Sequence, residues 1–396
     1  MPGDQVRPVL FVHIPKTAGT SLLLSLQNLF GDNRVKRLEM DPFLREKLKA
    51  ILDGGSKNLS CISGHIPIWH FAGHLEKFLP FTILRNPVDR IISMFRFLRH
   101  HPQSTLQQLG LRPGFTFGEF LASSAPEVFA QVRNGMTRAL CDDPAVWNTE
   151  SPKYQHISRE PRALENAVSL LKQIDFGLSE KMEKSMQLLQ RLLDVPFEID
   201  EPKVNVGSRA DGDDESLANI HAILKLNEFD TALYKIATDL FESKELRVSP
   251  AAPDRARLLF SPALNHTYMI GDIPGRCGFH ELEEAQFCWL RIDSSTRVNL
   301  LPPAPVYRIV LVFYCIMSNY PMTDIGIEAN GRKVPYEATR QADPRWYTLQ
   351  TGPIEAHEGV NVLSITPPVF ISAREAVPGT SDRRYLAVAL QNIRFV

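Results

Sequence analysis

The first thirty residues restrict the fold most strongly. Residues 8–13 form a short apolar run of the length of a buried strand. Small, hydroxyl and basic residues follow up to Ser21, and residues 19–30 have the leucine spacing of a helix. A buried strand that passes through a short loop into a helix is the repeating unit of an α/β layer. The sequence therefore predicts a parallel sheet flanked by helices, with a P-loop-like turn after its first strand.

The pattern of short apolar runs and amphipathic segments continues to about residue 246. Further strands are predicted at residues 59–63, 81–84 and 174–178, and further helices at 88–98, 180–193 and 217–242. In a doubly wound sheet, ligands collect at the carboxyl ends of the strands. We therefore expect the loops that follow these strands to face one crevice.

The composition changes after Val248. The segment Ser249-Pro250-Ala251-Ala252-Pro253 is typical of a linker, and β-rich runs at 307–316, 325–328, 361–365 and 386–395 follow it. We predict two domains, residues 1–248 and residues 249–396, the second an all-β sandwich-like domain. Its Trp289, Trp346 and Tyr347 either stack on sugar rings, which suggests glycan or acceptor binding, or fill the core; the core is the favoured interpretation.

The charge balance and the cysteines exclude several classes of protein. The 44 Lys and Arg offset 45 Asp and Glu, so no global charge attracts nucleic acid or a membrane surface, and any anion site is local. The five cysteines form no C-x-x-C pair and are predicted to be reduced and mostly buried, and no metal site is expected. The start of the chain lacks the features of a signal peptide, and the longest apolar stretch, 309–317, is too short to span a bilayer. These features predict a cytoplasmic protein.

The loop after the first strand has the residues of an anion site. Backbone N–H groups at a helix N-terminus bind anions, Thr20 and Ser21 add hydroxyls, and Lys16 adds a mobile positive charge. Lys16 precedes Gly19, whereas a Walker A lysine directly follows its second glycine, so a kinase or ATPase is disfavoured. The alternative is an ordinary strand-to-helix turn with a solvated lysine.

A second segment, residues 81–95, supplies a further pair of polar groups. Arg85 ends a predicted strand, and Ser93 lies a little more than two turns along the next helix. Together they are suited to a second phosphate at the same edge of the sheet. Taken separately, Arg85 is equally suited to a surface ion pair and Ser93 to an ordinary helix position.

These spaced motifs resemble a known family. The chain is similar, over about residues 7–246, to the cytosolic and Golgi sulfotransferases that use 3′-phosphoadenosine 5′-phosphosulfate (PAPS), and among them to the branch that includes the heparan sulfate 2-O-sulfotransferases. Residues 13–21 look like the 5′-phosphosulfate loop and residues 84–95 like the 3′-phosphate motif. Segments 134–138, 176–183, 203–206 and 230–234 also follow the family's order. The resemblance implies a PAPS-binding set made of Lys16, Thr17, Ala18, Gly19, Thr20, Ser21, Arg85, Ser93, Arg138 and Asn205.

The expected reaction is transfer of the sulfuryl group from PAPS to an acceptor hydroxyl. Lys16 is expected to neutralise charge on the leaving phosphate, and His65, which follows a predicted strand, is the candidate base. The resemblance points to the same Gly-His position, although Pro67 stands where the 2-O branch commonly has a second histidine. His70 and His74 are second choices for the base, and His13 is interpreted as a structural support for the loop.

The acceptor is the least constrained part of the interpretation. The basic residues of 96–101, together with Arg133 and Arg138, either form a rim for an anionic acceptor or are simply solvated. We expect the acceptor to be a carbohydrate or glycolipid. Two other classes of protein stay open. One is another nucleotide-dependent phosphoryl transferase such as a kinase, and the other is a glycan-binding protein with an inactive donor site.

Overall fold

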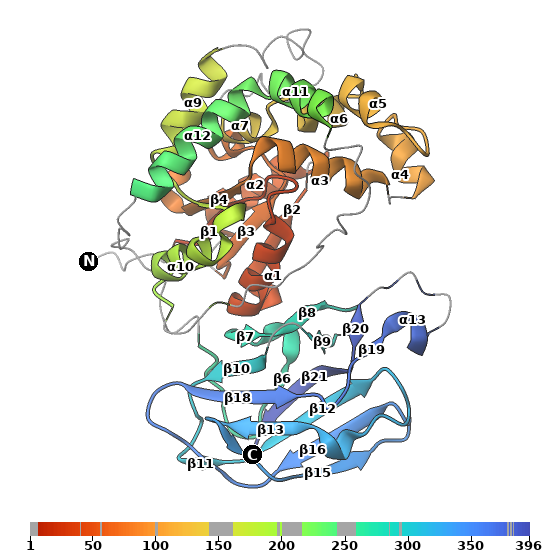
Figure 1. Ribbon diagram of the computed structural model, residues 1–396. Coiled ribbons are helices and arrows are strands. Elements are labelled where there is room, and N and C mark those ends of the chain that lie inside the picture. The colour runs from red at the N-terminus through yellow and green to blue at the C-terminus, as the bar shows by residue number, and fades with distance from the viewer. Residues whose placement is uncertain are drawn as a thin grey trace, which may run out of the picture. The chain divides into compact units, whose positions relative to one another are not determined.

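The computed structural model describes residues 7–39, 41–55, 58–99, 102–141, 161–195, 199, 216–243, 259–284, 286–292, 295–377, 380, 382 and 384–396. Contacts divide the chain into two units (Figure 1). The first holds Met1–Thr20, Lys36–Leu192 and Val204–Ala251, and the second holds Ser21–Val35, Leu193–Lys203 and Ala252–Val396. The predicted domain boundary at 248/249 lies outside the described residues.

The first unit is built on a five-stranded sheet in the order β2-β3-β1-β4-β5. Its strands are β1 (Val9–Val12), β2 (Val35–Leu38), β3 (Cys61–Gly64), β4 (Leu79–Leu84) and β5 (Asp175–Leu178). β1 pairs in parallel with β3 and with β4, and β4 pairs in parallel with β5. The prediction of a parallel sheet flanked by helices is confirmed, although β2 was not predicted.

Helices surround this sheet (Figure 1). They are α2 (Leu44–Ala50), α3 (Pro87–Arg99), α4 (Gln103–Gln108), α5 (Phe117–Ala122), α6 (Pro126–Val132), α7 (Gly135–Leu140), α9 (Pro161–Leu171), α10 (Met182–Leu192), α11 (Leu217–Leu226) and α12 (Glu228–Ser243). Helix α1 (Gly19–Phe30) begins in this unit, and its residues from Ser21 on belong to the second unit. One apolar cluster joins the sheet to α2, α7, α9 and α12, and a second joins α3 to α5, α6 and α11. Burial of these apolar faces is what holds the helices in place.

Two predicted helices need correction. The expected single helix over 217–242 is two helices, because the fully buried Asn227 ends α11. Its Nδ2 donates to the carbonyls of Val132 and Ile223, at 2.9 and 3.0 Å, so a polar side chain bonds to backbone there. The expected helix over 180–193 begins as a short 3-10 turn, η6 (Ser179–Lys181), before α10.

The second unit contains the predicted antiparallel all-β region. One sheet has the order β14-β13-β18-β10-β7, and a larger one contains β15-β16-β12-β21-β9-β8, with β6 paired to β21. The strands are β6 (Thr267–Met269), β7 (Arg276–Cys277), β8 (Phe279–Leu282), β9 (Cys288–Leu290), β10 (Thr296–Leu300), β11 (Val306–Tyr307), β12 (Ile309–Cys315), β13 (Gly326–Ala329), β14 (Arg332–Lys333), β15 (Tyr336–Arg340), β16 (Trp346–Thr351), β17 (Ile354–Glu355), β18 (Asn361–Thr366), β19 (Ile371–Ser372), β20 (Tyr385–Leu386) and β21 (Val388–Phe395), with one short helix, α13 (Ala373–Ala376). A single apolar cluster draws side chains from both large sheets, as in a sandwich.

The aromatic residues of this region contact one another. Trp289 is only 6% exposed and belongs to an apolar cluster, in agreement with the core interpretation. The rings of Phe287 and Tyr314 are stacked with centroids 5.0 Å apart, and the half-buried Trp346 lies 5.1 Å from Tyr314. All five cysteines are buried free thiols, as predicted.

Within the second unit, a buried arginine ties residues 21–35 to the β-rich part. Arg276 is 2% exposed, and its Nη2 lies 2.6 Å from Asp32 Oδ2 and 3.1 Å from the carbonyl oxygen of Gln27. Asn28 Nδ2 also donates to the carbonyl of Phe279 at 3.2 Å. An unpaired buried charge is costly, so the pair of Arg276 and Asp32 holds residues 21–35 against the β-rich part of this unit.

Candidate active site

The loop between β1 and α1 has a strained backbone. Lys16 and Ala18 have φ values of 67° and 68°, in the left-handed region that side chains with a Cβ rarely adopt. Each such residue costs about 1–3 kcal/mol and persists only where its surroundings hold it in place. Strain of this kind is concentrated at ligand-binding turns, so the loop from residue 13 to residue 18 is where we look first for a site.

Gly19 and His13 fit together at the start of α1. A Cβ added at Gly19 would lie 2.0 Å from His13 Cδ2 and 2.3 Å from its Nε2, far inside contact distance. The His13 ring is 8% exposed and stacks on Phe11 with centroids 5.4 Å apart. Burial, with His65, Arg37 and Lys16 adding smaller effects, lowers the pKa of His13 to about 3. His13 is therefore neutral at ordinary pH, which supports its interpretation as a structural residue.

Lys16 extends from the loop to helix α3. Its Nζ lies 4.0 Å from the centroid of the Phe97 ring, in the geometry of a cation–π contact. Burial, followed by the charge of Arg85, lowers the pKa of Lys16 to about 8. Phe97 was not among the predicted site residues, because an exposed aromatic on a helix carries no sequence signal of this role.

The hydroxyl residues of the loop differ in what they bond. Thr17 is fully buried, and its Oγ1 donates to the carbonyl of Ile14 at 2.9 Å. The hydroxyl proton of Thr17 is thus engaged within the loop. Thr20 is half-buried, and Ser21 is buried in the first turn of α1, where backbone N–H groups have no intrahelical partner.

Arg85 is tied to the loop. It follows β4, and its Nη1 donates to the backbone carbonyl of Lys16 at 3.0 Å. The two segments predicted to hold two phosphates are therefore in direct contact. Ser93 is half-buried on α3, four residues before Phe97, so the Ser93 side chain lies on the face of α3 over which Lys16 is placed.

Glu180 and Tyr234 fix the turn that carries Arg85. The backbone N–H of Asn86 donates to Glu180 Oε1 at 2.8 Å, and the Asn86 side chain accepts from Val88 N at 2.9 Å. Tyr234 donates its hydroxyl to Glu180 Oε2 at 2.7 Å, and burial followed by this bond raises the pKa of Tyr234. Both residues lie in segments that the sequence singled out, but their positioning role depends on a contact across 54 residues.

His65 follows β3 and lies next to His13. Val12 pairs with Gly64, so the two histidines follow neighbouring strands, with ring centroids 4.4 Å apart. His65 reaches solvent, yet desolvation by nearby protein atoms, followed by Arg37, lowers its pKa, while Glu39 raises it. The imidazole is therefore neutral at pH 7 and able to accept a proton.

Comparison with known proteins assigns the chain to a family. The model of the Sulfotransferase family matches residues 4–236, which is more than half of the chain and includes every residue of the site described so far. The chain belongs to the sulfotransferase family. A search of curated proteins gave no match.

Solved structures similar to this sulfotransferase are distant. One is a family GH115 4-O-methyl-α-glucuronidase, BtGH115A, specific for decorated arabinogalactans, at 10% identity over 78% of this chain, with a TM-score of 0.22. Another is a β-glucosidase from Paenibacillus barengoltzii, at 13% identity over 58% of this chain, with a TM-score of 0.17. The chain spans 39% and 20% of those two structures. With TM-scores this low, neither likeness bears on its fold or function.

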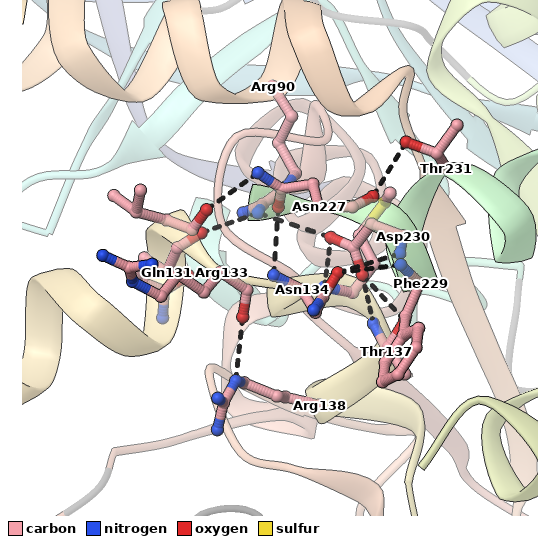
Figure 2. Close-up of polar contacts among 12 residues, drawn as sticks. Arg90, Gln131, Arg133, Asn134, Thr137, Arg138, Asn227, Phe229, Asp230 and Thr231 are labelled. Atoms are coloured by element: carbon pink, nitrogen blue, oxygen red, sulfur yellow. Dashed lines mark hydrogen bonds and ion pairs between the residues drawn. The ribbon is translucent and has the colours of Figure 1, made fainter. Parts of the chain in front are cut away.

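A buried polar cluster in the sulfotransferase joins α7 and α12 (Figure 2). Asp230 accepts hydrogen bonds from Met136 N at 3.0 Å, and from Thr137 N and Oγ1 at 2.7 and 2.8 Å, at the start of α7. Asn134 Oδ1 in turn accepts from the backbone of Phe229 and Asp230 at the start of α12. Two segments that the sequence associated with function thus cap each other's helices.

Arg90 completes the Asn134–Asp230 cluster. Its side chain is fully buried, with Nη2 2.6 Å from the carbonyl of Gln131 and 3.5 Å from Asp230 Oδ2. Because Arg90 lies on α3 between Arg85 and Ser93, the cluster also sets the position of that helix. Breaking a buried pair of this kind typically costs about 3–5 kcal/mol.

The remaining predicted residues have varied surroundings. Arg138 is 1% exposed, and its Nε donates to the carbonyl of Arg133 at 2.8 Å. His70 stacks on Trp69, and burial lowers its pKa to about 4. Asn205, His100 and His101 lie outside the described residues. Within the described part of the chain, no group of three potential metal ligands occurs and no helix is long and apolar enough to cross a membrane.

Proposed function

We propose that this sulfotransferase uses PAPS as donor and transfers its sulfuryl group to a hydroxyl of a saccharide or glycolipid. The observation that carries the proposal is the 3.0 Å hydrogen bond from Arg85 Nη1 to the Lys16 carbonyl. It joins the segment proposed for the 5′-phosphosulfate to the segment proposed for the 3′-phosphate. A nucleotide with anions at both positions matches this pair, whereas ATP has no 3′-phosphate.

The residues of the loop fit an anion in several ways. Residues with positive φ, such as Lys16 and Ala18, occur in anion-binding nests, and α1 adds the N–H groups of its first turn. Gly19, Thr20 and Ser21 occupy that first turn. Arg85 and Ser93 are the proposed partners of the 3′-phosphate. Arg138 and Asn205 remain proposals from the resemblance alone.

The catalytic roles follow from charge and protonation. PAPS supplies a sulfur–oxygen bond to a good phosphate leaving group. His65 accepts the proton of the acceptor hydroxyl as the new oxygen–sulfur bond forms, since its ring is neutral and reaches solvent. Lys16 leaves Phe97 to neutralise the phosphate oxygens as the old bond breaks. A fixed cation at the point where charge develops is a large contribution to such reactions.

Nucleotide binding tests the donor. We expect adenosine 3′,5′-bisphosphate to bind at least about tenfold more tightly than adenosine 5′-monophosphate or ATP, by isothermal titration. Arg85→Ala is expected to remove this preference. Arg99→Ala removes the same charge from an exposed position on α3 and is expected to keep it. A preference of the parent protein for ATP contradicts the proposal and favours phosphoryl transfer.

Transfer assays with labelled PAPS test the two catalytic roles. Lys16→Ala is expected to lower kcat about 10²–10³-fold through loss of charge stabilisation. His65→Ala is expected to lower it about 10²–10⁴-fold through loss of the base, while His70→Ala leaves it nearly unchanged. Unchanged turnover in both Lys16→Ala and His65→Ala removes these assignments. Binding without any turnover in the parent favours a glycan-binding protein with an inactive donor site.

The acceptor class needs a direct screen. A panel of hydroxylated saccharides, glycolipids and phenols with labelled donor separates the classes, and preferential labelling of phenols contradicts a saccharide acceptor. The resemblance to the heparan sulfate 2-O branch supports a saccharide. An accessory role of the β-rich region in glycan or acceptor binding stays a prediction, and Trp346→Ala tests it by its effect on KM for a saccharide acceptor.

A further inference from the structure

A cleft of about 620 Å³ lies in the first unit, apart from the donor loop. Its walls come from α2, from the turn at Ile51–Gly55, and from the short helices η3 (Ile68–Phe71) and η4 (Leu75–Lys77). Its volume lies within the roughly 300–1,000 Å³ that is usual for small-molecule sites. None of the donor-site residues lines it, so the mechanism above does not use it.

The interior of the cleft is apolar and its rim is positively charged. Leu44, Leu48 and Leu52 line it together with Trp69. The exposed cations Arg45, Lys49 and Lys77 also line it. Of its two acids, Asp41 pairs with Lys47 on α2, so cations outnumber the free carboxylates.

The arrangement of the cations favours an anion. Arg45 and Lys49 are four residues apart on α2 and therefore neighbours on one helix face. Like charges at this spacing repel each other. An anionic group placed between them removes this repulsion.

Two polar atoms on residues that line the cleft have no hydrogen-bond partner. They are Trp69 Nε1 and His70 Nε2, both buried, on rings that stack with centroids 3.7 Å apart. An indole N–H can only donate, so it requires an acceptor atom such as a carboxylate oxygen. Buried donors without partners are uncommon and costly, which suggests that a ligand supplies the acceptor.

We propose that this cleft binds an acidic amphiphile, a small molecule with an apolar body and one anionic head group. The body packs against the leucines and Trp69. The head lies between Arg45 and Lys49 and accepts from Trp69 Nε1. The proposal goes beyond the donor site, and its test does not depend on sulfuryl transfer.

The first experiment compares three probes on the full chain. Decanoate, the neutral decanol and the short butyrate are titrated by calorimetry and by tryptophan fluorescence. Decanoate is expected to bind at least about tenfold more tightly than decanol, because of the head group. It is expected to bind at least about a hundredfold more tightly than butyrate, because of the buried methylenes. Equal binding of decanoate and decanol, or of decanoate and butyrate, overturns the proposal.

Variants then locate the site. The double variant Arg45→Ala/Lys49→Ala is expected to weaken decanoate about tenfold and leave decanol unchanged. Arg332→Ala/Lys333→Ala removes the same charge from the exposed strand β14 and is expected to have no effect. Trp69→Phe keeps an aromatic ring but removes the N–H, and is expected to abolish the fluorescence response and weaken decanoate. The proposal is overturned if both double variants weaken decanoate binding equally. It is also overturned if Arg45→Ala/Lys49→Ala and Trp69→Phe leave the affinity for decanoate unchanged. Neither result depends on the outcome of the experiments with PAPS.

Discussion

The donor loop and the Asn134–Asp230 cluster use polar residues in opposite ways. In the cluster, the Asp230 carboxylate accepts three hydrogen bonds and lies 3.5 Å from Arg90. In the loop, Lys16 rests on the Phe97 ring and pairs with no carboxylate among the described residues, and its backbone is strained. The carboxylate of the cluster is therefore bonded within the fold, whereas the charge of Lys16 is, in our proposal, available to a ligand.

This difference separates two kinds of motif that look alike in sequence. Both are short segments of small and polar residues at the start of a helix. Satisfied groups stabilise the fold, so removing one lowers stability. Strained or unsatisfied groups are held by the rest of the fold, so changing one alters binding and can even raise stability. The predictions below test this division from the largest expected effect to the smallest.

Asp230→Ala is expected to have the largest effect. It leaves the fully buried Arg90 without its carboxylate and the N–H groups of Met136 and Thr137 without an acceptor. The expected loss in free energy of unfolding is about 3–5 kcal/mol. Urea unfolding followed by circular dichroism measures it.

The matched control is Asp239→Ala, at an exposed position on the same helix, α12. Surface changes of this kind usually stay within about 0.5 kcal/mol. A loss no larger for Asp230→Ala than for Asp239→Ala refutes a structural role for the cluster.

Gly19→Ala is expected to have the next largest effect. The new methyl group overlaps the His13 ring, and such overpacking costs about 1–3 kcal/mol. Because the ring and the loop must move apart, binding of adenosine 3′,5′-bisphosphate is expected to weaken as well. Gly118→Ala on α5, where the added atom meets nothing within 4 Å, is the control. It is expected to raise the free energy of unfolding by up to about 1 kcal/mol, because alanine favours a helix over glycine, and to leave nucleotide binding unchanged.

A double variant sharpens this test. His13→Ala/Gly19→Ala removes the overlapping ring, so part of the stability lost in Gly19→Ala is expected to return. If the two changes add without coupling, the contact between His13 and Gly19 is not the cause.

Much of the fold follows from the sequence, because hydrophobic period and turn residues are local signals. The strands at 9–12, 61–64, 79–84 and 175–178 lie within one or two residues of their predicted ends. The break at Asn227 was missed, because it depends on bonds to Val132 and to Asn134, more than 90 residues away. A leucine-rich helical period does not reveal such a bond.

The candidate site was predictable only as separate pieces. The positions of Lys16, His65 and Arg85 after strands were evident from the pattern, and parallel pairing brings strand ends together. The contact of Lys16 with Phe97, and the support of Arg85 by Glu180 and Tyr234, depend on packing between distant segments. Contacts between distant segments do not change the hydrophobic periodicity of the sequence, so one sequence does not reveal them.

The pH dependence of kcat/KM for PAPS is expected to report the ionisation of Lys16 and His65. The proposed mechanism requires a charged Lys16, whose pKa is lowered to about 8. It also requires a neutral His65, whose pKa is below the usual 6.5. We therefore expect kcat/KM for PAPS to rise below pH 6.5, level off, and fall about tenfold between pH 7 and pH 9.

Variants assign the two limbs of this profile. Lys16→Arg keeps its charge to high pH and is expected to remove the basic limb, and His65→Ala is expected to remove the acidic limb. The free energy of unfolding is expected to rise with pH over the range in which kcat/KM falls. Because folding lowers the pKa of Lys16 from 10.5 to about 8, the unfolded chain binds more protons in this window, and the folded state gains stability as pH rises through it. A basic limb that persists in Lys16→Arg contradicts the assignment.

Ala18→Gly is expected to have the smallest effect and the opposite sign. At a φ of 68°, glycine relieves strain that alanine cannot avoid, and the relief exceeds the added freedom of the unfolded chain. We expect a gain of about 0.5–1 kcal/mol in free energy of unfolding, together with weaker binding of adenosine 3′,5′-bisphosphate as the loop loses its fixed shape. Ala232→Gly, within α12, is expected to cost about 1 kcal/mol and to leave nucleotide binding unchanged. Opposite signs at these two alanines confirm that the backbone is strained at Ala18, whereas a loss of stability at both shows that the loop belongs to the rigid scaffold.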